Sequence, residues 1–387
     1  MSTVYGLLYL NEIKYDDIAW TMLNAGRTIK VIDTGISIHS MAQGDIDRVK
    51  ELLTGDGIDV AITMDFAPAV SDACETLGIK YVSWIYDMPQ QELYEKQVGN
   101  DCNYIFSFDK IQIEQIKEAG GKHVFYQPLA TNVYRNSGLV INPEDEARFS
   151  CDVSFVGSLY NDDSYGDVLG KASDETQSEI EAIVNSSFGI WDGKNRINGR
   201  LSDSAISELW KIYGGNDTDS FSMDKDTYLG ARLFARYISF LERSCILESL
   251  SDYDVRLHTN DTSISIPGVK VGGRLSYDEE LPRMYYLSKI NLNISLHSIL
   301  SGVPLRVFDI MGVGGFMLTN YQPEIEELFT IGKDIEVFHD IDELHDKVSF
   351  YLANEKARLQ IALNGYKLVS EKYSYDRAIE SILAKIG

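Results

Sequence analysis

The chain has 387 residues, enough for two globular domains, and its 44% hydrophobic and 24% charged content is ordinary for a soluble protein. Its formal net charge of −24 argues against a nucleic-acid partner, because the phosphates of nucleic acids require a basic surface. The same acidity argues, more weakly, against docking on anionic lipid through a basic face.

The first third of the chain alternates apolar runs with amphipathic segments. Strands are predicted at Val4–Asn11, Thr28–Asp33, Asp59–Asp65, Lys80–Asp87, Tyr104–Asp109 and His123–Ala130. The intervening segments predict helices at Asp16–Ala25, Gly44–Leu53 and Pro68–Leu77, and a further helix that ends at Ala119. Near-continuous apolar strands separated by helices are typical of a parallel sheet that is covered on both faces.

Four of these predicted strands end at an aspartate: Asp33, Asp65, Asp87 and Asp109. The carboxyl ends of the strands border the ligand crevice in an open α/β sheet, so the four carboxylates could form one acidic rim. The ordinary alternative is that each aspartate caps the helix that follows it. We expect most of them to be caps and one to take part in chemistry.

The rest of the chain predicts a second α/β unit. The polar, irregular segment 132–150 has the composition of a linker, and Cys151–Asp162 opens the new unit. A polar helical segment at 162–230 interrupts it. Strand and helix alternation then resumes, and the tail at 340–386 is helical, with a last helix that could reach back to the first unit. No apolar run reaches the roughly 20 residues that a membrane span needs.

Targeting and redox signals are weak. The N-terminal residues MSTVYGLLYLNEIKYDD lack the basic n-region and cleavage site of a secretory signal. The four cysteines are far apart and form no CxxC pair, which favours reduced thiols over a disulfide framework or a zinc site. We therefore expect a cytoplasmic protein.

The segment from Leu292 to Thr319 is the most informative part of the chain. A strand runs into a Ser/Gly-containing loop, Pro304 then opens a helix, and GVGG ends that helix before the next strand. Unpaired N–H groups and the helix dipole both favour an anion at a helix N-terminus. We expect the backbone amides of this loop to hold a diphosphate, and the residues concerned are Ser301, Gly302 and Val303.

Two charged side chains on the same helix complete the expected donor pocket. Arg306 would add charge-assisted hydrogen bonds to phosphate, and Asp309 would accept hydrogen bonds from the hydroxyls of a ribose. The alternative is a tight strand–helix turn in which Arg306 makes a surface ion pair and Asp309, three residues later, is its partner.

Glycines after other strands are weaker candidates for the same pocket. Gly157 and Ser158 follow the first strand of the second unit, where a glycine permits close approach of a phosphate, although the pattern is neither GxGxxG nor a Walker loop. Gly273 and Arg274, with Tyr277 nearby, could line a base pocket through backbone groups and stacking. An ordinary turn explains these glycines equally well.

Three histidines are candidates for chemistry. His258 and His297 each follow a predicted strand and would face the crevice, where His297 could contact phosphate or sugar. His39 lies in the loop after the second strand, where a base acting on an acceptor would sit. A lone loop histidine is more often only hydrogen-bonded.

One short motif suggests a metal. Asp217-Thr218-Asp219 has the DxD pattern that clamps a metal and a sugar diphosphate, but it lies in a Gly/Asn/Ser-rich loop, not at the end of an apolar strand. We interpret it as a surface loop. No His/Cys/Glu cluster has metal-ligand spacing, and there is no GxSxG motif. We expect no metal and no cofactor.

Three stretches resemble a bacterial glycosyltransferase family of the GT-B fold, the group 1 type related to spore-maturation glycosyltransferases. They are WIYDMPQQELY (84–94) with the segment 102–132, CDVSFVGSLYN (151–161), and the segment 289–338. The resemblance implies two Rossmann-like domains facing a cleft, with the donor nucleotide sugar on the C-terminal domain and the acceptor on the N-terminal one. It covers most of the chain, and the segment 162–230 adds little to it.

The family also implies roles for particular residues. Relatives that retain the anomeric configuration carry a Glu-x7-Glu pair around the donor turn. Here Asp309 falls at the second position, which binds ribose in relatives, and Ser301 falls at the first, which touches the sugar. Arg306 and the Gly314-Gly315 turn match the family pattern. Because Ser301 departs from it, a retaining and an inverting course both stay open.

The α/β pattern and the resemblance together predict the following organisation. An N-terminal acceptor-side domain spans 1–131 and packs against a final helix at 373–387. A linker follows at 132–150. A nucleotide-sugar-binding domain spans 151–372 and contains the helical insertion 162–230.

We predict a metal-independent glycosyltransferase that moves a sugar from a nucleoside-diphosphate sugar, with UDP among the candidate nucleotides, to a hydroxyl of a glycan or protein. An inverting enzyme needs a base on the acceptor side, for which Asp87 is the first candidate and His39 the second. The alternatives are a nucleotide-sugar epimerase of the same fold and a catalytically inactive sugar-nucleotide-binding module.

Overall fold

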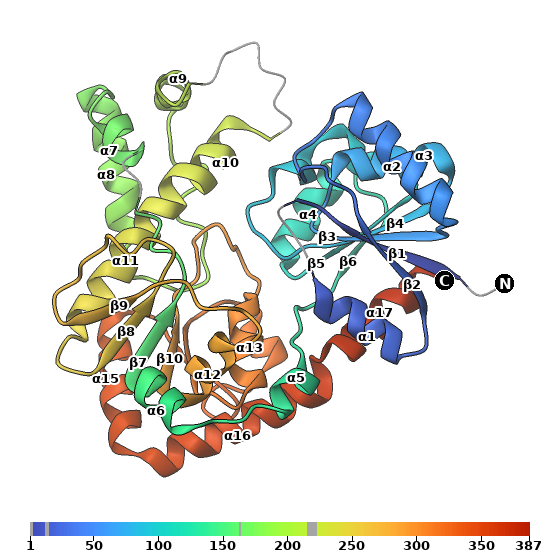
Figure 1. The fold of residues 1–387 in the computed structure, drawn as a ribbon. Coiled ribbons are helices and arrows are strands. Elements are labelled where there is room, and N and C mark those ends of the chain that lie inside the picture. Colours follow the sequence, from blue (N-terminus) through green and yellow to red (C-terminus); the bar gives the residue numbers. More distant parts are fainter. Residues whose placement is uncertain (1–2, 12–14, 162–163, 215–222) are drawn as a thin grey trace. The chain divides into compact units, whose positions relative to one another are not determined.

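The computed structural model describes residues 3–11, 15–161, 164–214 and 223–387. The chain divides into two compact units, each built around one sheet (Figure 1). The first unit comprises Met1–Ala130 together with Lys372–Gly387, and the second comprises Thr131–Glu371.

The first unit contains a six-stranded parallel sheet in the order β2-β1-β3-β4-β5-β6. Its strands are β1 (Val4–Tyr9), β2 (Thr28–Asp33), β3 (Val60–Met64), β4 (Lys80–Trp84), β5 (Asn103–Ser107) and β6 (Val124–Tyr126). All five residues of β3 are buried, as expected for a central strand covered on both faces. The predicted parallel sheet is confirmed.

Helices connect and cover these strands. They are α1 (Asp16–Asn24), α2 (Gln43–Asp56), α3 (Pro68–Leu77), the short 3₁₀ turns η1 (Gln91–Tyr94) and η2 (Lys96–Gly99), and α4 (Lys110–Glu118). The C-terminal helix α17 (Tyr375–Ile386) belongs to the same unit. Its Tyr375 ring packs edge-on against the buried Trp84 at the end of β4, with 6.2 Å between ring centroids.

The second unit contains another six-stranded parallel sheet, in the order β12-β11-β10-β7-β8-β9. Its strands are β7 (Cys151–Val156), β8 (Val255–His258), β9 (Val269–Gly272), β10 (Ser288–Asn293), β11 (Met317–Asn320) and β12 (Glu336–Phe338). This is the doubly wound order, in which the direction of winding reverses between β7 and β10. Ligands bind at such a reversal, beyond the carboxyl ends of the two strands.

The helices of the second unit surround this sheet. They are α5 (Val133–Ser137), α6 (Pro143–Phe149), α11 (Ala235–Ser249), α12 (Glu280–Leu287), α13 (Leu305–Gly312), α14 (Ile325–Leu328), α15 (Ile341–Ala353) and α16 (Glu355–Lys372). The two short helices α5 and α6 lie in the segment that we expected to link two domains.

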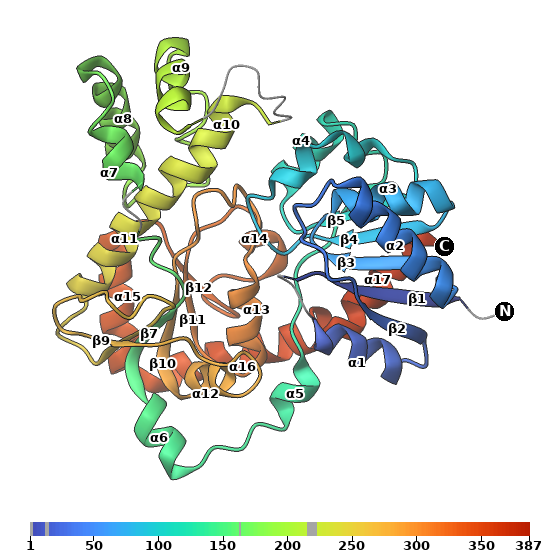
Figure 2. The same ribbon diagram turned by 45° about the horizontal axis from the view of Figure 1, so that its top comes forward.

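A group of helices projects from the second unit beyond one end of α11 (Figure 2). It contains α7 (Ser164–Leu169), α8 (Asp174–Ser187), α9 (Asp203–Ile212), α10 (Lys225–Leu229) and the π-helical turn η3 (Gly230–Phe234), which runs into α11. These helices share an apolar core of their own, which includes Ile180, Leu209 and Phe234. Leu296, from the loop after β10, belongs to the same core, so the helical group is anchored beside the point where the sheet reverses. Across the described ranges, no helix combines the length and the apolar character needed to cross a bilayer.

Candidate functional site

Two arginines occupy the reversal point of the second sheet. Arg243, on α11, donates from Nη1 to the carbonyl oxygen of Ser158 at 2.5 Å and from Nε to that of Ile294 at 3.1 Å. Its guanidinium therefore joins the segment after β7 to the segment after β10. The residue is only 2% exposed, and burial lowers its pKa to about 10, which still leaves it charged at neutral pH.

Arg306, the first-turn arginine of α13, reaches the same place. Its Nη1 donates to Asn293 Oδ1 at 2.6 Å, and its guanidinium lies 5.1 Å from the centre of the Phe155 ring. The Arg243 guanidinium lies 5.2 Å from the same ring. A Cβ atom added at Gly157 would lie 2.6 Å from Arg306 Nη2, so the glycine is what allows this arginine to approach.

This arrangement changes the role that we expected for Gly157. Its amide already donates to the carbonyl oxygen of His258 at 2.9 Å, so the glycine makes room for a guanidinium and its N–H is used within the sheet. Two guanidinium groups that share one aromatic ring repel each other unless an anion lies between or beside them. The pair is therefore suited to a ligand with more than one negative charge.

A side-chain hydrogen bond fastens the loop before α13. The Ser301 hydroxyl donates to Glu324 Oε1 at 2.7 Å, and Glu324, just before α14, is 1% exposed. The Ser301 hydroxyl is thus paired with a carboxylate that lies 23 positions later in the chain. Ser301, Gly302 and Val303 are all buried.

Asp309 lies on α13 with its carboxylate held by two hydroxyls. Thr131 Oγ1 donates to Asp309 Oδ1 at 2.7 Å, and Tyr277 OH donates to Oδ2 at 3.1 Å. The alternative pairing with Arg306 is therefore not what fixes this carboxylate, since Arg306 hydrogen-bonds to Asn293.

Asp309 and Tyr277 border a small open hollow, about 180 Å³ when the solvent space in front of it is included, which Arg135 and Tyr285 also line. The Arg135 guanidinium lies 4.9 Å from the centre of the Tyr277 ring. A carboxylate, an aromatic ring and a cation together can bind sugar hydroxyls and a flat base. The hollow adjoins the arginine pair, because the Arg306 guanidinium is near enough to the Tyr285 side chain to influence its pKa.

The remaining turn residues are farther from this chemistry. His258 Nδ1 lies 3.0 Å from the carbonyl oxygen of Gly273, and burial lowers the His258 pKa, so the ring ties the ends of β8 and β9 together as a neutral group. Arg274 follows in the exposed turn after β9. The structure therefore groups Gly157, Ser158 and Arg306 and, next to them, Asp309 and Tyr277, whereas Gly273 and Arg274 lie in the turn.

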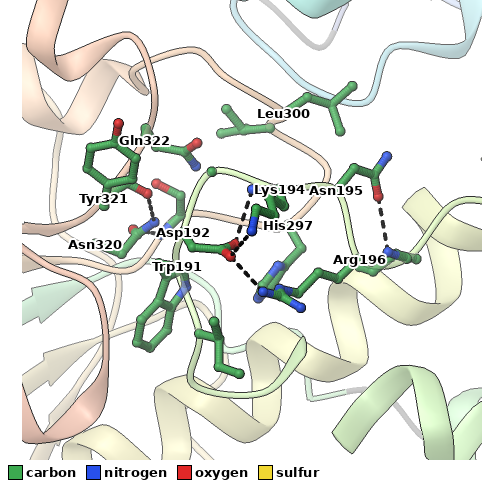
Figure 3. Close-up of a pocket in the computed structure, with 15 residues that line it drawn as sticks. Trp191, Asp192, Lys194, Asn195, Arg196, His297, Leu300, Asn320, Tyr321 and Gln322 are labelled. Atoms are coloured by element: carbon green, nitrogen blue, oxygen red, sulfur yellow. Dashed lines mark hydrogen bonds and ion pairs between the residues drawn. The ribbon is translucent and has the colours of Figure 1, made fainter. Parts of the chain in front are cut away.

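A polar pocket lies beside the carboxyl ends of β10 and β11 (Figure 3). It encloses about 460 Å³, part of it open to solvent, and one wall is the segment 190–197 that follows α8. His297 contributes from the loop after β10. Its Nε2 lies 2.9 Å from both carboxylate oxygens of Glu242, and Glu242 is fully buried. His297 is thus anchored by an acidic partner and lines this pocket.

In the first unit, carboxylates gather at the strand ends. Asp65, after β3, accepts hydrogen bonds from the backbone amides of Tyr86 at 2.7 Å and Asp87 at 3.0 Å. Burial and the nearby Asp87 charge raise the Asp65 pKa. Loss of hydration also raises the Asp87 pKa, although the residue is partly open to solvent. Among the described residues, the Asp87 carboxylate has no hydrogen-bond partner, which leaves it available to a proton donor.

His39 lies in the same unit with a partner that the sequence did not suggest. Its Nδ1 lies 2.6 Å from Glu92 Oε1. The His39 side chain is 64% exposed, whereas that of Glu92 is 11% exposed. A buried carboxylate that holds Nδ1 leaves Nε2 directed outward as a possible proton acceptor. Both candidate bases, Asp87 and His39, therefore belong to the first unit and have chemically suitable surroundings.

The expectation that most strand-end aspartates are helix caps is wrong. Only Asp109 caps the next helix, by accepting from the Gln112 amide at 3.0 Å. Asp33 accepts a hydrogen bond from the backbone amide of Gly35, two residues later. Asp65 instead accepts one from the backbone amide of Tyr86, in the segment after β4. The reason is that α2 and α3 begin 10 and 3 residues after these aspartates, beyond the reach of a capping side chain.

The DxD motif Asp217–Asp219 lies outside the described residues. Within the ranges that are described, no three His, Cys, Asp or Glu side chains come together as ligands for a metal ion.

Sequence reasoning missed Arg243, Glu242, Glu92 and Glu324. Each is a charged residue that is buried or nearly so. Its hydrogen-bond partner lies far away in the sequence. For Glu242 and Arg243, the one local signal is that both charged residues fall on the face of α11 that also carries Ile238, Ile246 and Leu247.

Comparisons with known proteins agree on the architecture. A family profile described as "Glycosyl transferase-like" matches residues 241–384, a range that holds Arg243, Arg306 and Asp309. None of the curated protein sequences matches the chain.

Solved structures resemble the whole chain at low sequence identity. A glycosyltransferase from Rickettsia africae has a TM-score of 0.55 and 10% identity, covering 99% of this chain and 97% of its own. Anabaena HepE, in complex with UDP and glucose, has a TM-score of 0.54 and 11% identity, with 99% of each chain covered. T4 phage BGT, in complex with UDP-glucose, has a TM-score of 0.53 and 10% identity, covering 99% of this chain and 98% of its own. The predicted GT-B fold is confirmed.

Proposed function

We propose that the chain is a glycosyltransferase that takes a nucleoside-diphosphate sugar as donor and passes its sugar to a hydroxyl of a glycan or protein. The observation that carries the proposal is the arginine pair at the sheet reversal, where Arg243 and Arg306 lie on the same Phe155 ring. Two fixed positive charges at this position match a diphosphate.

The same pair explains how a diphosphate would leave. When the bond from the sugar to the phosphate oxygen breaks, negative charge builds up on the leaving group. Guanidinium groups already held by Ser158, Ile294 and Asn293 stabilise that charge without having to move first. This is why the proposal needs no metal ion for the departure of the leaving group.

The neighbouring hollow supplies a place for the nucleoside. Asp309 would accept hydrogen bonds from the ribose, and Tyr277 would stack on the base. UDP is the first nucleotide to test, because the similar structures of HepE and T4 phage BGT were solved with UDP or UDP-glucose. The acceptor would be served from the first unit, by Asp87 or His39 if the enzyme inverts.

A panel of nucleotide sugars tests the proposal. Release of nucleoside diphosphate from at least one donor, undiminished by a metal chelator, is the expected result. A donor converted into a different sugar nucleotide would indicate an epimerase. Thermal stabilisation by a donor with no release over many hours would indicate a binding module. Either of these results would contradict the proposal.

A further inference from the structure

Two adjacent residues of α11, Glu242 and Arg243, link the polar pocket beside β10 to the arginine pair through hydrogen bonds. Glu242 accepts from the Gly189 amide at 2.9 Å and pairs with His297, which lines the pocket. The next residue, Arg243, donates to the carbonyl oxygen of Ile294, and Ser295 after it also lines the pocket. A group attached to a phosphate at the arginines therefore has this pocket as its neighbour.

One carboxylate is fixed in the wall of the pocket (Figure 3). Asp192 Oδ1 accepts from the Lys194 amide at 3.2 Å, and Oδ2 accepts from Arg196 Nη2 at 2.6 Å. The Lys194 Nζ atom lies 3.4 Å from Oδ2. Partial burial opposes ionisation, but the hydrogen bonds from Arg196 and Lys194 outweigh it and lower the Asp192 pKa. An ionised carboxylate is an acceptor with lone pairs to spare.

Two unused donors accompany this acceptor. The indole Nε1 of Trp191 has no hydrogen-bond partner among the described residues, although Trp191 is only 5% exposed. The Nε of Arg196 is buried and likewise has no partner within the described part of the chain. Trp191, Asp192 and Arg196 all line the pocket, and Gln322, 7% exposed, adds an amide to the lining.

We infer that this pocket holds the sugar ring of the donor and selects a hexose whose ring hydroxyls are free, against deoxy sugars. The inference rests on the proposed function. A hydroxyl donates one hydrogen bond and accepts another, so a single ring hydroxyl can satisfy the Asp192 carboxylate and an N–H of Trp191 or Arg196 at the same time. A ring that carries hydrogen at that position leaves both partners unpaired in a partly buried site, which is how proteins reject such analogues strongly.

The wall segment itself favours this chemistry over an apolar ligand. The cations Lys194 and Arg196 share the Asp192 carboxylate, so the carboxylate offsets one of the two positive charges and one remains on the wall. The groups that remain for a ligand are directional hydrogen-bond donors and acceptors. A neutral polyol can bind to both kinds.

Calorimetry on the whole chain tests the inference with three ligands: the nucleoside diphosphate, the same nucleotide carrying a fully hydroxylated hexose, and its single-deoxy analogues. For the wild type we expect at least one deoxy analogue to bind about 100-fold or more weaker than the parent. In Asp192→Asn that ratio should fall to a few-fold, while the affinity for the bare diphosphate stays unchanged. Trp191→Phe keeps the ring and removes the donor, and it should reduce the ratio in the same way.

A matched control and the opposing outcomes complete the design. Asp203→Asn removes an exposed aspartate at the start of α9 and should leave every ratio as in the wild type. Equal binding of parent and deoxy analogues by the wild type, or an unchanged ratio in folded Asp192→Asn, would overturn the inference. Weaker binding of the bare diphosphate in Asp192→Asn would also overturn it, since the pocket would then serve the phosphate. Because these readouts are affinities, discrimination without turnover would refute the proposed function and leave the pocket assignment standing.

Discussion

The two sheets share a parallel architecture but place opposite charge at their strand ends. In the second unit, Arg243 and Arg306 meet where the strand order reverses between β7 and β10. In the first unit, the residue after β3 is Asp65, and Asp87 follows β4. In both units the fold places functional side chains at the carboxyl ends of the strands. The residue types at these ends then determine whether the site binds an anion or accepts a proton.

Removing a base from the first unit should have the greatest effect on activity. If the enzyme inverts with Asp87 as base, Asp87→Asn should lower turnover by about 10²–10⁴-fold and leave the Michaelis constant for the donor unchanged. If His39 is the base, His39→Ala should do so instead, and Glu92→Gln should reproduce part of the loss because Glu92 holds the ring. Steady-state kinetics on the three variants decides between them.

His345→Ala is the control for this experiment. Its Nε2 lies 2.9 Å from Ser249 Oγ, so it is a hydrogen-bonded histidine at the surface of the second unit that lines neither pocket. Its turnover should equal that of the wild type. Full activity in both Asp87→Asn and His39→Ala would show that the first unit supplies no base, as a retaining course requires.

The next prediction concerns the arginine pair of the second unit and its role in binding a diphosphate. Arg306→Met keeps an unbranched stem over Phe155 and removes the charge, so it should weaken nucleoside diphosphate binding by about 1.5–3 kcal/mol. Arg243→Met should do the same and should also lower the free energy of unfolding by about 1–3 kcal/mol, because the carbonyl oxygens of Ser158 and Ile294 lose a buried donor. Calorimetry and urea denaturation measure the two effects separately.

Arg200→Met is the control, since Arg200 is exposed and lies three residues beyond the polar pocket wall. It should change neither quantity. Unaltered diphosphate affinity in Arg306→Met would remove Arg306 from the phosphate site and with it the main support for the proposed function.

The sequence predicted the architecture well because the signal for it is local. Apolar runs such as that of β3 and helix boundaries such as Pro68–Leu77 follow from residues adjacent in the chain, and both are found as predicted. The strand-end aspartates were located correctly but their roles were not. Asp65 accepts hydrogen bonds from the backbone amides of Tyr86 and Asp87 because the neighbouring strand β4 ends beside it. The residues next to Asp65 in the sequence do not show where that strand ends, so they could not predict this role.

The candidate site was predictable only for residues next to the informative loop. Arg306 and Asp309 were found because α13 carries both, but their partners Asn293, Thr131 and Tyr277 come from other elements. Arg243 and Glu242 were missed because they approach from α11 through tertiary packing alone. Their charge is stabilised by carbonyl oxygens and a histidine that are 51 to 85 positions away in the chain.

The smallest expected effect concerns the buried carboxylate of the first unit. The folded-state pKa of Asp65 is raised, chiefly by burial and then by Asp87. The unfolded chain therefore loses the Asp65 proton near the ordinary aspartate pKa of about 4, while the folded chain still holds it. From there up to the folded-state pKa, the unfolded state binds fewer protons, so this residue lowers stability progressively as the pH rises.

Asp65→Asn should cancel that pH-dependent loss. Asparagine keeps an oxygen for the amides of Tyr86 and Asp87, and it tolerates the left-handed backbone at this position, where φ is 58°. Urea denaturation should give the variant and the wild type the same free energy of unfolding near pH 4. At pH 8 the free energy of unfolding of the variant should be higher by about 1 kcal/mol or more, which corresponds to a pKa shift of roughly one unit. Asp33→Asn, which alters an exposed strand-end aspartate, should show no such divergence. If the Asp65→Asn curve runs parallel to that of the wild type across this range, Asp65 is ionised in the folded protein throughout. The strand ends of the first unit would then carry a further full negative charge, and their contrast with the arginine pair of the second unit would be larger than we infer.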